Sequence, residues 1–340
     1  MPDPQHLAPL VGLLQLLGVG LAMAVVLAVF HTAWSLTHPP RRTYSWAVAR
    51  KLPGDPAELT PSRPFEAFTF RGCRSDLPAW RVPGDNPDGP VVVLTHGWGS
   101  SRIGGLKRLG AVLPHCRAAI LWDLPGHGEA PGTARLGVDE HADLLALLDA
   151  SDAGSRPPIV LFGWSLGAGV CLRAAAENGP HDLRAVICEA PYLMPASPAR
   201  AVIALRGLPH RINLPLAMAS LGTLFGIGPR WRGFDRARHA ARLGDLPVTV
   251  IHGDADPVCP IADGRTIAEA APNARFVPIP GGGHNNLWTD SRFEPAVRRA
   301  VADAVRAHTP SPAPAGEVPE QREGGGGSDA HSRRDRPNHT

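Results

Sequence analysis

Short apolar runs alternate with longer amphipathic stretches through most of the chain. The runs are rich in Val, Ile, Leu and Phe and are bounded by Gly, Pro or charged residues, which is typical of buried strands. The longer stretches have the spacing of helices that cover a sheet. This alternation predicts an α/β fold with a doubly wound, mainly parallel sheet that opens with a hairpin. Strands are expected at 65–70, 79–82, 91–94, 118–122, 159–162, 185–188, 248–251 and 276–279, and helices at 104–113, 139–148, 165–177, 261–271 and 293–307.

One apolar segment near the N-terminus is too long for a strand or an ordinary helix. Residues 10–30 are apolar except for Gln15 and small glycines. At 1.5 Å per residue this segment is about 30 Å long, which matches the hydrocarbon core of a bilayer. A cleaved signal peptide is the alternative, and it fits poorly because no Lys or Arg precedes the segment. We therefore predict a single transmembrane helix within residues 1–36.

The charges that follow this helix predict its orientation. By the positive-inside rule, basic residues mark the side of the helix that stays in the cytoplasm. This places the remainder of the chain in the cytoplasm, on the membrane surface. The first basic residues come after the helix and are Arg41, Arg42, Arg50 and Lys51.

Composition shifts divide the remaining chain. Residues 37–64 are rich in Pro and charge and are expected to be a linker, and residues 65–308 are expected to form the folded domain. Within that domain, residues 191–234 break the strand–helix alternation with an apolar stretch interrupted by Pro and Gly. We interpret it as a cap over a binding site, with a pair of ordinary core helices as the open alternative. Residues 309–340 have the composition of a disordered tail.

Overall composition excludes several other classes of function. The net charge is only +3 and the arginines are scattered, so no nucleic-acid partner is expected. The five cysteines show no CxxC spacing, which argues against a disulfide framework or a zinc site and favours a reducing compartment. The sequence leaves the oligomeric state open.

The strongest chemical signal is Gly-Trp-Ser-Leu-Gly at residues 163–167. Such a pentapeptide is common by chance, but this one follows a predicted strand and opens a predicted helix. A serine on that sharp turn requires small residues two before and two after it, which Gly163 and Gly167 provide. We predict Ser165 as the nucleophile. The backbone N–H of Leu166, at the helix N-terminus, is then placed to stabilise an oxyanion.

Two later loops hold the partners that a serine nucleophile needs. A serine hydroxyl requires an imidazole to accept its proton and a carboxylate to orient that imidazole. His284 follows the last predicted strand on a Gly-rich loop. Asp254 and Asp256 follow the strand before it. The residues alone do not decide which of these two acids orients His284. The order Ser, acid, His is the order of an α/β-hydrolase triad.

Together these motifs resemble the α/β-hydrolase superfamily over residues 71–308. Within it, the chain resembles serine hydrolases such as monoacylglycerol lipases, serine aminopeptidase-like enzymes and membrane-anchored depalmitoylase-like enzymes. The resemblance selects Asp256 as the acid, three residues after the Gly that ends its strand. It also implies a second oxyanion donor, the backbone N–H of Trp98, with His96 ordering that loop. The matching segments are 96–99, 123–128, 163–167, 252–260 and 283–285.

The resemblance implies a serine hydrolase that cleaves a carboxylic ester or thioester through an acyl-Ser165 intermediate, with no metal and no cofactor. The membrane helix and the apolar cap favour a hydrophobic acyl group or a lipid-like ester. Nine apolar side chains of the cap are expected to line the acyl pocket. An acyltransferase or a peptidase is the alternative, because both use the same triad, and a membrane-tethered binding protein without turnover is a further one. The nine side chains are Leu205, Leu208, Leu214, Leu216, Met218, Leu221, Leu224, Phe225 and Ile227.

Overall fold

The computed structural model describes residues 4–151, 157–177, 179, 181–205, 207 and 210–307. The tail expected at residues 309–340 lies outside this part of the chain.

Eight strands form one sheet among the described residues. They are β1 (Glu66–Arg71), β2 (Asp76–Pro83), β3 (Val91–Thr95), β4 (Ala118–Trp122), β5 (Ile159–Trp164), β6 (Leu183–Glu189), β7 (Val248–Gly253) and β8 (Ala274–Ile279). Their order in the sheet is β1-β2-β4-β3-β5-β6-β7-β8. β2 is antiparallel to β1 and to β4, and the other neighbours are parallel. The predicted hairpin and the mainly parallel sheet are confirmed.

Strand ends differ slightly from the prediction where pairing extends them. β2 begins at Asp76 rather than at residue 79, because its first residues pair with the end of β1. The helix predicted at 104–113 is divided into the 3-10 turn η2 (Arg102–Gly105), the helix α3 (Leu106–Val112) and the 3-10 turn η3 (Leu113–His115). Pro114 has no amide hydrogen and clashes with the preceding turn, so α3 ends before it.

Helices cover both faces of the sheet. Successive residues of a strand point to opposite faces, and β3 illustrates this. Val91 and Val93 belong to the core with α4 (Glu140–Ser151), α5 (Leu166–Ala176), α8 (Arg236–Ala241) and α9 (Ile261–Ala270). Val92 and Leu94 belong to the core with α3 and α10 (Glu294–Arg306). A strand buried on both faces reads as a continuous apolar run, which is why the pattern identified it.

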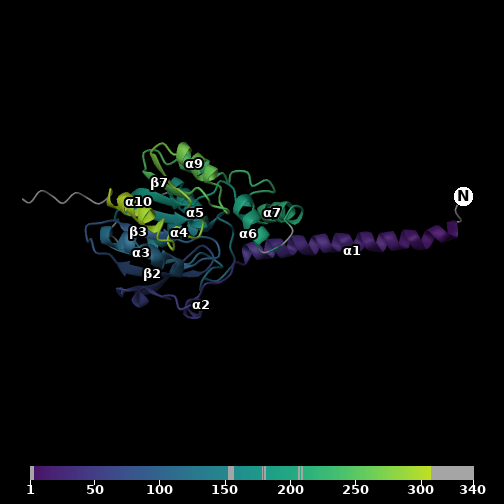
Figure 1. Ribbon diagram of the computed structural model, residues 1–340, viewed down its shortest axis with the longest axis horizontal. Helices are drawn as coiled ribbons and strands as arrows, with labels where there is room; N and C mark the ends of the chain where they lie inside the picture. The colour runs from purple at the N-terminus through teal and green to yellow at the C-terminus, as the bar shows by residue number, and fades with distance from the viewer. Residues whose placement is uncertain are drawn as a thin grey trace, which may run out of the picture. The chain divides into compact units, whose positions relative to one another are not determined.

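The long N-terminal helix α1 (Pro4–Thr37) projects from the helices of the insertion (Figure 1). Within its segment Val11–Thr37, which is long enough to span a membrane, an 18-residue stretch has a mean hydropathy of 2.5. Its last turns are buried, and the Thr32 hydroxyl accepts a hydrogen bond of 2.6 Å from Asn213 Nδ2. The insertion contains α6 (Ala196–Leu205) and α7 (Asn213–Leu224), and α7 packs along α1.

The segment between α1 and β1 is ordered and contacts the folded domain. It contains α2 (Tyr44–Val48) and the 3-10 turn η1 (Pro56–Glu58). The Arg41 guanidinium donates to the Ala130 carbonyl at 2.7 Å, and the Ser101 hydroxyl donates to the Arg42 carbonyl at 2.7 Å. This segment was expected only to connect two parts of the chain, and these contacts bring it to the edge of the candidate site.

Candidate active site

Ser165 lies on the turn between β5 and α5 in a backbone conformation that side chains rarely adopt, with φ 54° and ψ −114°. The turn closes because two glycines allow close backbone contacts. A Cβ on Gly163 would lie 2.3 Å from the carbonyl carbon of Gly167, and a Cβ on Gly167 would lie 2.0 Å from the Thr95 oxygen. The Ser165 N–H donates to the Glu189 carbonyl at 2.8 Å, which ties the turn to β6.

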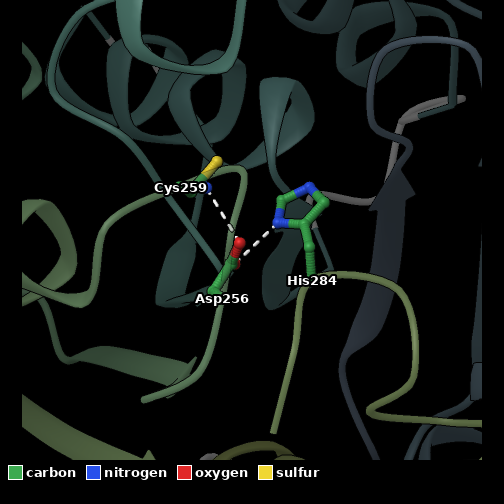
Figure 2. A group of neighbouring side chains, drawn as sticks. All are labelled: Asp256, Cys259 and His284. Atoms are coloured by element: carbon green, nitrogen blue, oxygen red, sulfur yellow. Dashed lines mark hydrogen bonds and ion pairs between the residues drawn. The ribbon is translucent and has the colours of Figure 1, made fainter. Parts of the chain in front are cut away.

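The structure brings the three predicted triad side chains together. Asp256 lies on the loop after β7 and His284 on the loop after β8, and their side chains point toward each other (Figure 2). His284 Nδ1 is 2.7 Å from Asp256 Oδ2, and His284 Nε2 is 3.2 Å from Ser165 Oγ. With Nδ1–H donating to the carboxylate, Nε2 is the acceptor for the serine hydroxyl. This geometry suits general-base activation of Ser165.

The carboxylate of Asp256 is fully buried and surrounded by donors. Burial by itself raises the pKa of Asp256, but His252, 3.6 Å away, and hydrogen bonds from His284 and the Cys259 N–H lower it by more. The backbone N–H groups of Val258 and Cys259 both donate to Oδ1 at 2.8 Å. The pKa of Asp256 therefore lies well below its usual range, and the side chain is ionised at neutral pH.

Asp254 makes a different contact. Its Oδ1 accepts a hydrogen bond of 2.6 Å from the Gly281 N–H, which joins the loop after β7 to the loop after β8. Asp254 is exposed, whereas Asp256 faces the buried side of its loop. The two acids therefore have separate environments, and only Asp256 contacts His284 among the bonds of the described residues.

The backbone groups expected to hold an oxyanion lie beside Ser165. Leu166 is the first residue of α5, where an N–H group has no acceptor within its own helix. The loop after β3 passes close to the nucleophile, since a Cβ on Gly97 would lie 3.2 Å from Ser165 Cβ. Trp98 follows on this loop, and its indole Nε1–H donates to the Leu36 carbonyl of α1 at 2.8 Å. The end of α1 is thus bonded directly to this loop.

His96 contacts the same loop from its buried side. It is fully buried, its Nε2 accepts a hydrogen bond of 3.0 Å from the Leu124 N–H, and its Nδ1 lies 2.8 Å from the Gly97 oxygen. Burial and the neighbouring His127 place the pKa of His96 well below its usual range, so the ring is neutral. These contacts suit a residue that orders the loop after β3.

A cavity of about 270 Å³ opens beside Ser165 and His284. One wall comes from α6 and the residues before it, and it includes Tyr192, Pro198 and Val202. Another wall comes from the segment after α1 and from the start of α3, and it includes Arg42 and Lys107. The α6 residues of the lining are therefore apolar, whereas Arg42 and Lys107 bring cations to it.

The nine cap residues do not line this cavity as expected. Only Leu205 is among the lining residues that the structure describes, and Leu208 lies outside the described part. Leu214, Met218, Leu221 and Phe225 are buried in a cluster with Leu36 and Trp231, with Ile227 packed against it, while Leu216 and Leu224 are exposed. The expectation was wrong because α7 packs on the end of α1, which the apolar pattern of α7 alone does not reveal.

A buried ion pair in the cavity wall was not predicted from the sequence. Arg108 Nη2 lies 2.5 Å from Glu189 Oε1, and Trp288 Nε1–H donates to Glu189 Oε2 at 2.7 Å. The Arg108 guanidinium lies 3.8 Å from the centre of the Trp164 ring, next to the nucleophile. No sequence signal joins these residues, because they come from α3, the end of β6 and the loop after β8.

Cys259 completes a cluster with Asp256 and His284 whose donor atoms lie within 4.8 Å of one another (Figure 2). Three such side chains are a possible metal-binding set. Here Nδ1 and Oδ2 are bonded to each other, and burial raises the pKa of the Cys259 thiol well above its usual value. A protonated thiol is a poor metal ligand, so the donor chemistry fits an acid–base pair better than a metal centre.

Comparisons with known proteins agree with the fold. The model of the alpha/beta hydrolase family matches residues 92–304, and the chain belongs to this family. It is 30% identical over 232 residues to a pimeloyl-[acyl-carrier protein] methyl ester esterase of Chromobacterium violaceum, covering 58% of this chain and 87% of that one. It is 27% identical over 305 residues to an uncharacterized protein of Mycobacterium tuberculosis, covering 88% and 93%.

A solved structure extends the comparison of the fold. An esterase of Pyrococcus furiosus superposes with a TM-score of 0.63 at 16% identity, covering 81% of this chain and 99% of that one. At this identity the likeness concerns the fold alone. Family and esterase relatives together support an enzyme that hydrolyses esters.

Proposed function

We propose that this protein is a membrane-anchored serine hydrolase that cleaves a carboxylic ester or thioester with a hydrophobic acyl group. The observation that carries the proposal is the chain of contacts from Asp256 through His284 to Ser165, at 2.7 and 3.2 Å. Its position at the ends of three strands, beside a cavity, is the position of a catalytic site in this type of fold. Esterases among its relatives support the same reaction class.

The proposed reaction has two stages. Ser165 Oγ attacks the ester carbonyl while His284 Nε2 accepts its proton, and the backbone N–H groups of Trp98 and Leu166 stabilise the oxyanion. His284 then donates that proton to the leaving group, which departs and leaves the acyl group on Ser165. In the second stage His284 deprotonates water, which attacks the acyl carbonyl, and the acid leaves as His284 returns the proton to Ser165 Oγ. Asp256 stays ionised throughout and holds Nδ1–H in the productive tautomer.

We further propose that α1 spans the membrane and that the hydrolase domain lies on its cytoplasmic side, following the basic residues after the helix. Residues 191–234 then act as a cap through α6, whose apolar side chains face the cavity. An acyl chain entering along α6 would be buried against Val202 and Leu205. This arrangement favours a lipid-like ester over a peptide.

Fluorophosphonate labelling of the full-length protein in detergent tests the nucleophile. Ser165→Ala should abolish labelling and lower ester hydrolysis by at least about 10³ while the circular dichroism spectrum stays unchanged. Ser220→Ala, at an exposed position on α7, is the matched control and should keep both. Labelling that persists in folded Ser165→Ala would reject Ser165. A wild-type protein that neither labels nor hydrolyses esters would favour the binding-protein alternative.

A further inference from the structure

Two cations in the cavity wall have no acidic partner among the described residues. Arg42 lies on the segment between α1 and α2, and Lys107 lies in the first turn of α3. Both line the cavity that contains Ser165 and His284. No described carboxylate lies within ion-pair distance of either side chain, whereas Arg108 in the same lining is paired with Glu189.

An acid in the same lining does not neutralise them. Glu189 is buried in the same cavity wall, but Arg108 binds both of its oxygens and the Trp288 indole binds one of them again. Arg108 and Glu189 therefore form a closed neutral pair. The two remaining charges leave this wall with a net positive charge beside the nucleophile.

The surroundings of the two cations oppose their charge. The pKa of Lys107 is lowered to about 8, chiefly by burial and also by Arg108 and Arg42, and Glu189 compensates only in part. Burial and Arg50 lower the pKa of Arg42, whose guanidinium lies 4.9 Å from the centre of the Trp46 ring. Both residues are nonetheless exposed. Like charges that line one cavity are stabilised when an anion binds to them.

The opposite chemical character of the α6 wall indicates which part of a substrate meets the cations. An acyl chain is stabilised along the apolar wall of Pro198, Val202 and Leu205. An acyl group that takes the apolar α6 residues leaves the part of the lining that carries Arg42 and Lys107 for the leaving group. We infer that the leaving group of the substrate carries an anionic group of the phosphate type, which these two side chains bind. This inference rests on the proposed ester hydrolysis at Ser165.

Two matched esters test the inference on the full-length protein in a neutral detergent. They are 1-octanoylglycerol 3-phosphate and 1-octanoylglycerol, which differ only in the phosphate. Wild-type kcat/KM should be about tenfold higher for the phosphate ester, since hydrogen bonds to a charged group are strong where water is partly excluded. Lys107→Gln and Arg42→Gln should each reduce that ratio several-fold. Lys51→Gln, an exposed lysine outside the cavity, should leave the ratio unchanged.

Other outcomes would overturn the inference in distinguishable ways. A ratio of one or less in the wild type, with both esters hydrolysed, removes the anionic leaving group and leaves the hydrolase intact. A ratio that Lys51→Gln lowers as much as Lys107→Gln does would show a general charge effect and not a site. Inhibition of octanoylglycerol hydrolysis by inorganic phosphate, with no preference between the esters, would assign the cations to a free anion. Hydrolysis of neither ester, with Ser165 unlabelled by fluorophosphonate, would overturn the proposed function as well.

Discussion

The catalytic edge and the entrance of the cavity are built in different ways. The catalytic edge consists of the loops after β3, β5, β7 and β8, and hydrogen bonds between their backbones and side chains fix its atoms. The entrance is formed by the end of α1, the segment after it, α3 and α6, which meet through apolar packing and a few bonds. The difference suggests that the edge determines the chemistry and that the entrance determines which substrate reaches it.

The largest effect is expected at the edge. Asp256→Asn should lower kcat by about 10³–10⁴ on every ester tested, because the amide stabilises the wrong tautomer of His284. Asp254→Asn is the matched control two residues away, and it should cost far less because, among the described residues, the Asp254 carboxylate accepts a hydrogen bond only from the Gly281 N–H. Steady-state kinetics on purified, folded variants decide the ranking. Equal losses would mean that both acids support His284.

The second effect tests whether the C-terminal end of α1 contributes to the cavity entrance. A chain that begins at residue 43 loses Leu36, Pro40 and Arg42 from the cavity wall, and the Trp98 indole loses its acceptor. Its kcat/KM on an octanoyl ester should be at least about tenfold lower than that of a chain that begins at residue 31. Both are measured in the same detergent. Equal values would show that the entrance does not depend on α1.

A smaller effect should change the substrate and spare the chemistry. Val202→Phe fills part of the cavity beside α6, so the preferred acyl chain should become shorter. Each methylene that is no longer buried should cost about 0.8 kcal/mol of binding free energy. Leu224→Phe, on the exposed side of α7, should leave the chain-length profile unchanged. A series of p-nitrophenyl esters from acetate to decanoate gives both profiles. A profile that shifts in both variants, or in neither, would argue against α6 as the acyl wall.

The smallest expected effect is a pH dependence at the entrance. The pKa of Lys107 is about 8, lowered by burial and by Arg108 and Arg42 and raised only partly by Glu189. The cationic form binds the anion, so the preference for the phosphate ester should be full below this pKa and should fall a few-fold as pH rises from 7 to 9. The ratio of kcat/KM for the two esters cancels changes common to both. Lys107→Gln should give a flat ratio.

A region can be predicted from the sequence when the residues that form it are close together in the chain, and the two regions differ in this respect. Ser165 and its flanking glycines are neighbours in the chain, and the strand before them and the helix after them have strong patterns, so the turn was predictable. The entrance depends on Leu36, Lys107 and Val202, which are far apart in the chain and carry no motif. The apolar pattern of α7 predicted burial correctly, yet it contained no information on whether a substrate or α1 would cover those side chains.

The backbone of Ser165 also has a consequence for the thermodynamics of the fold. A residue other than glycine at φ 54° and ψ −114° costs of the order of 1–3 kcal/mol, and a folded domain is stable by only about 5–15 kcal/mol. The backbone strain at this one residue thus lowers the free energy of unfolding by a substantial fraction. The hydrogen bond to Glu189 and the packing around Gly163 and Gly167 must offset it. Substitutions that stabilise this turn by relaxing it would therefore move the serine hydroxyl away from His284, so thermal stability and turnover are opposed at this residue.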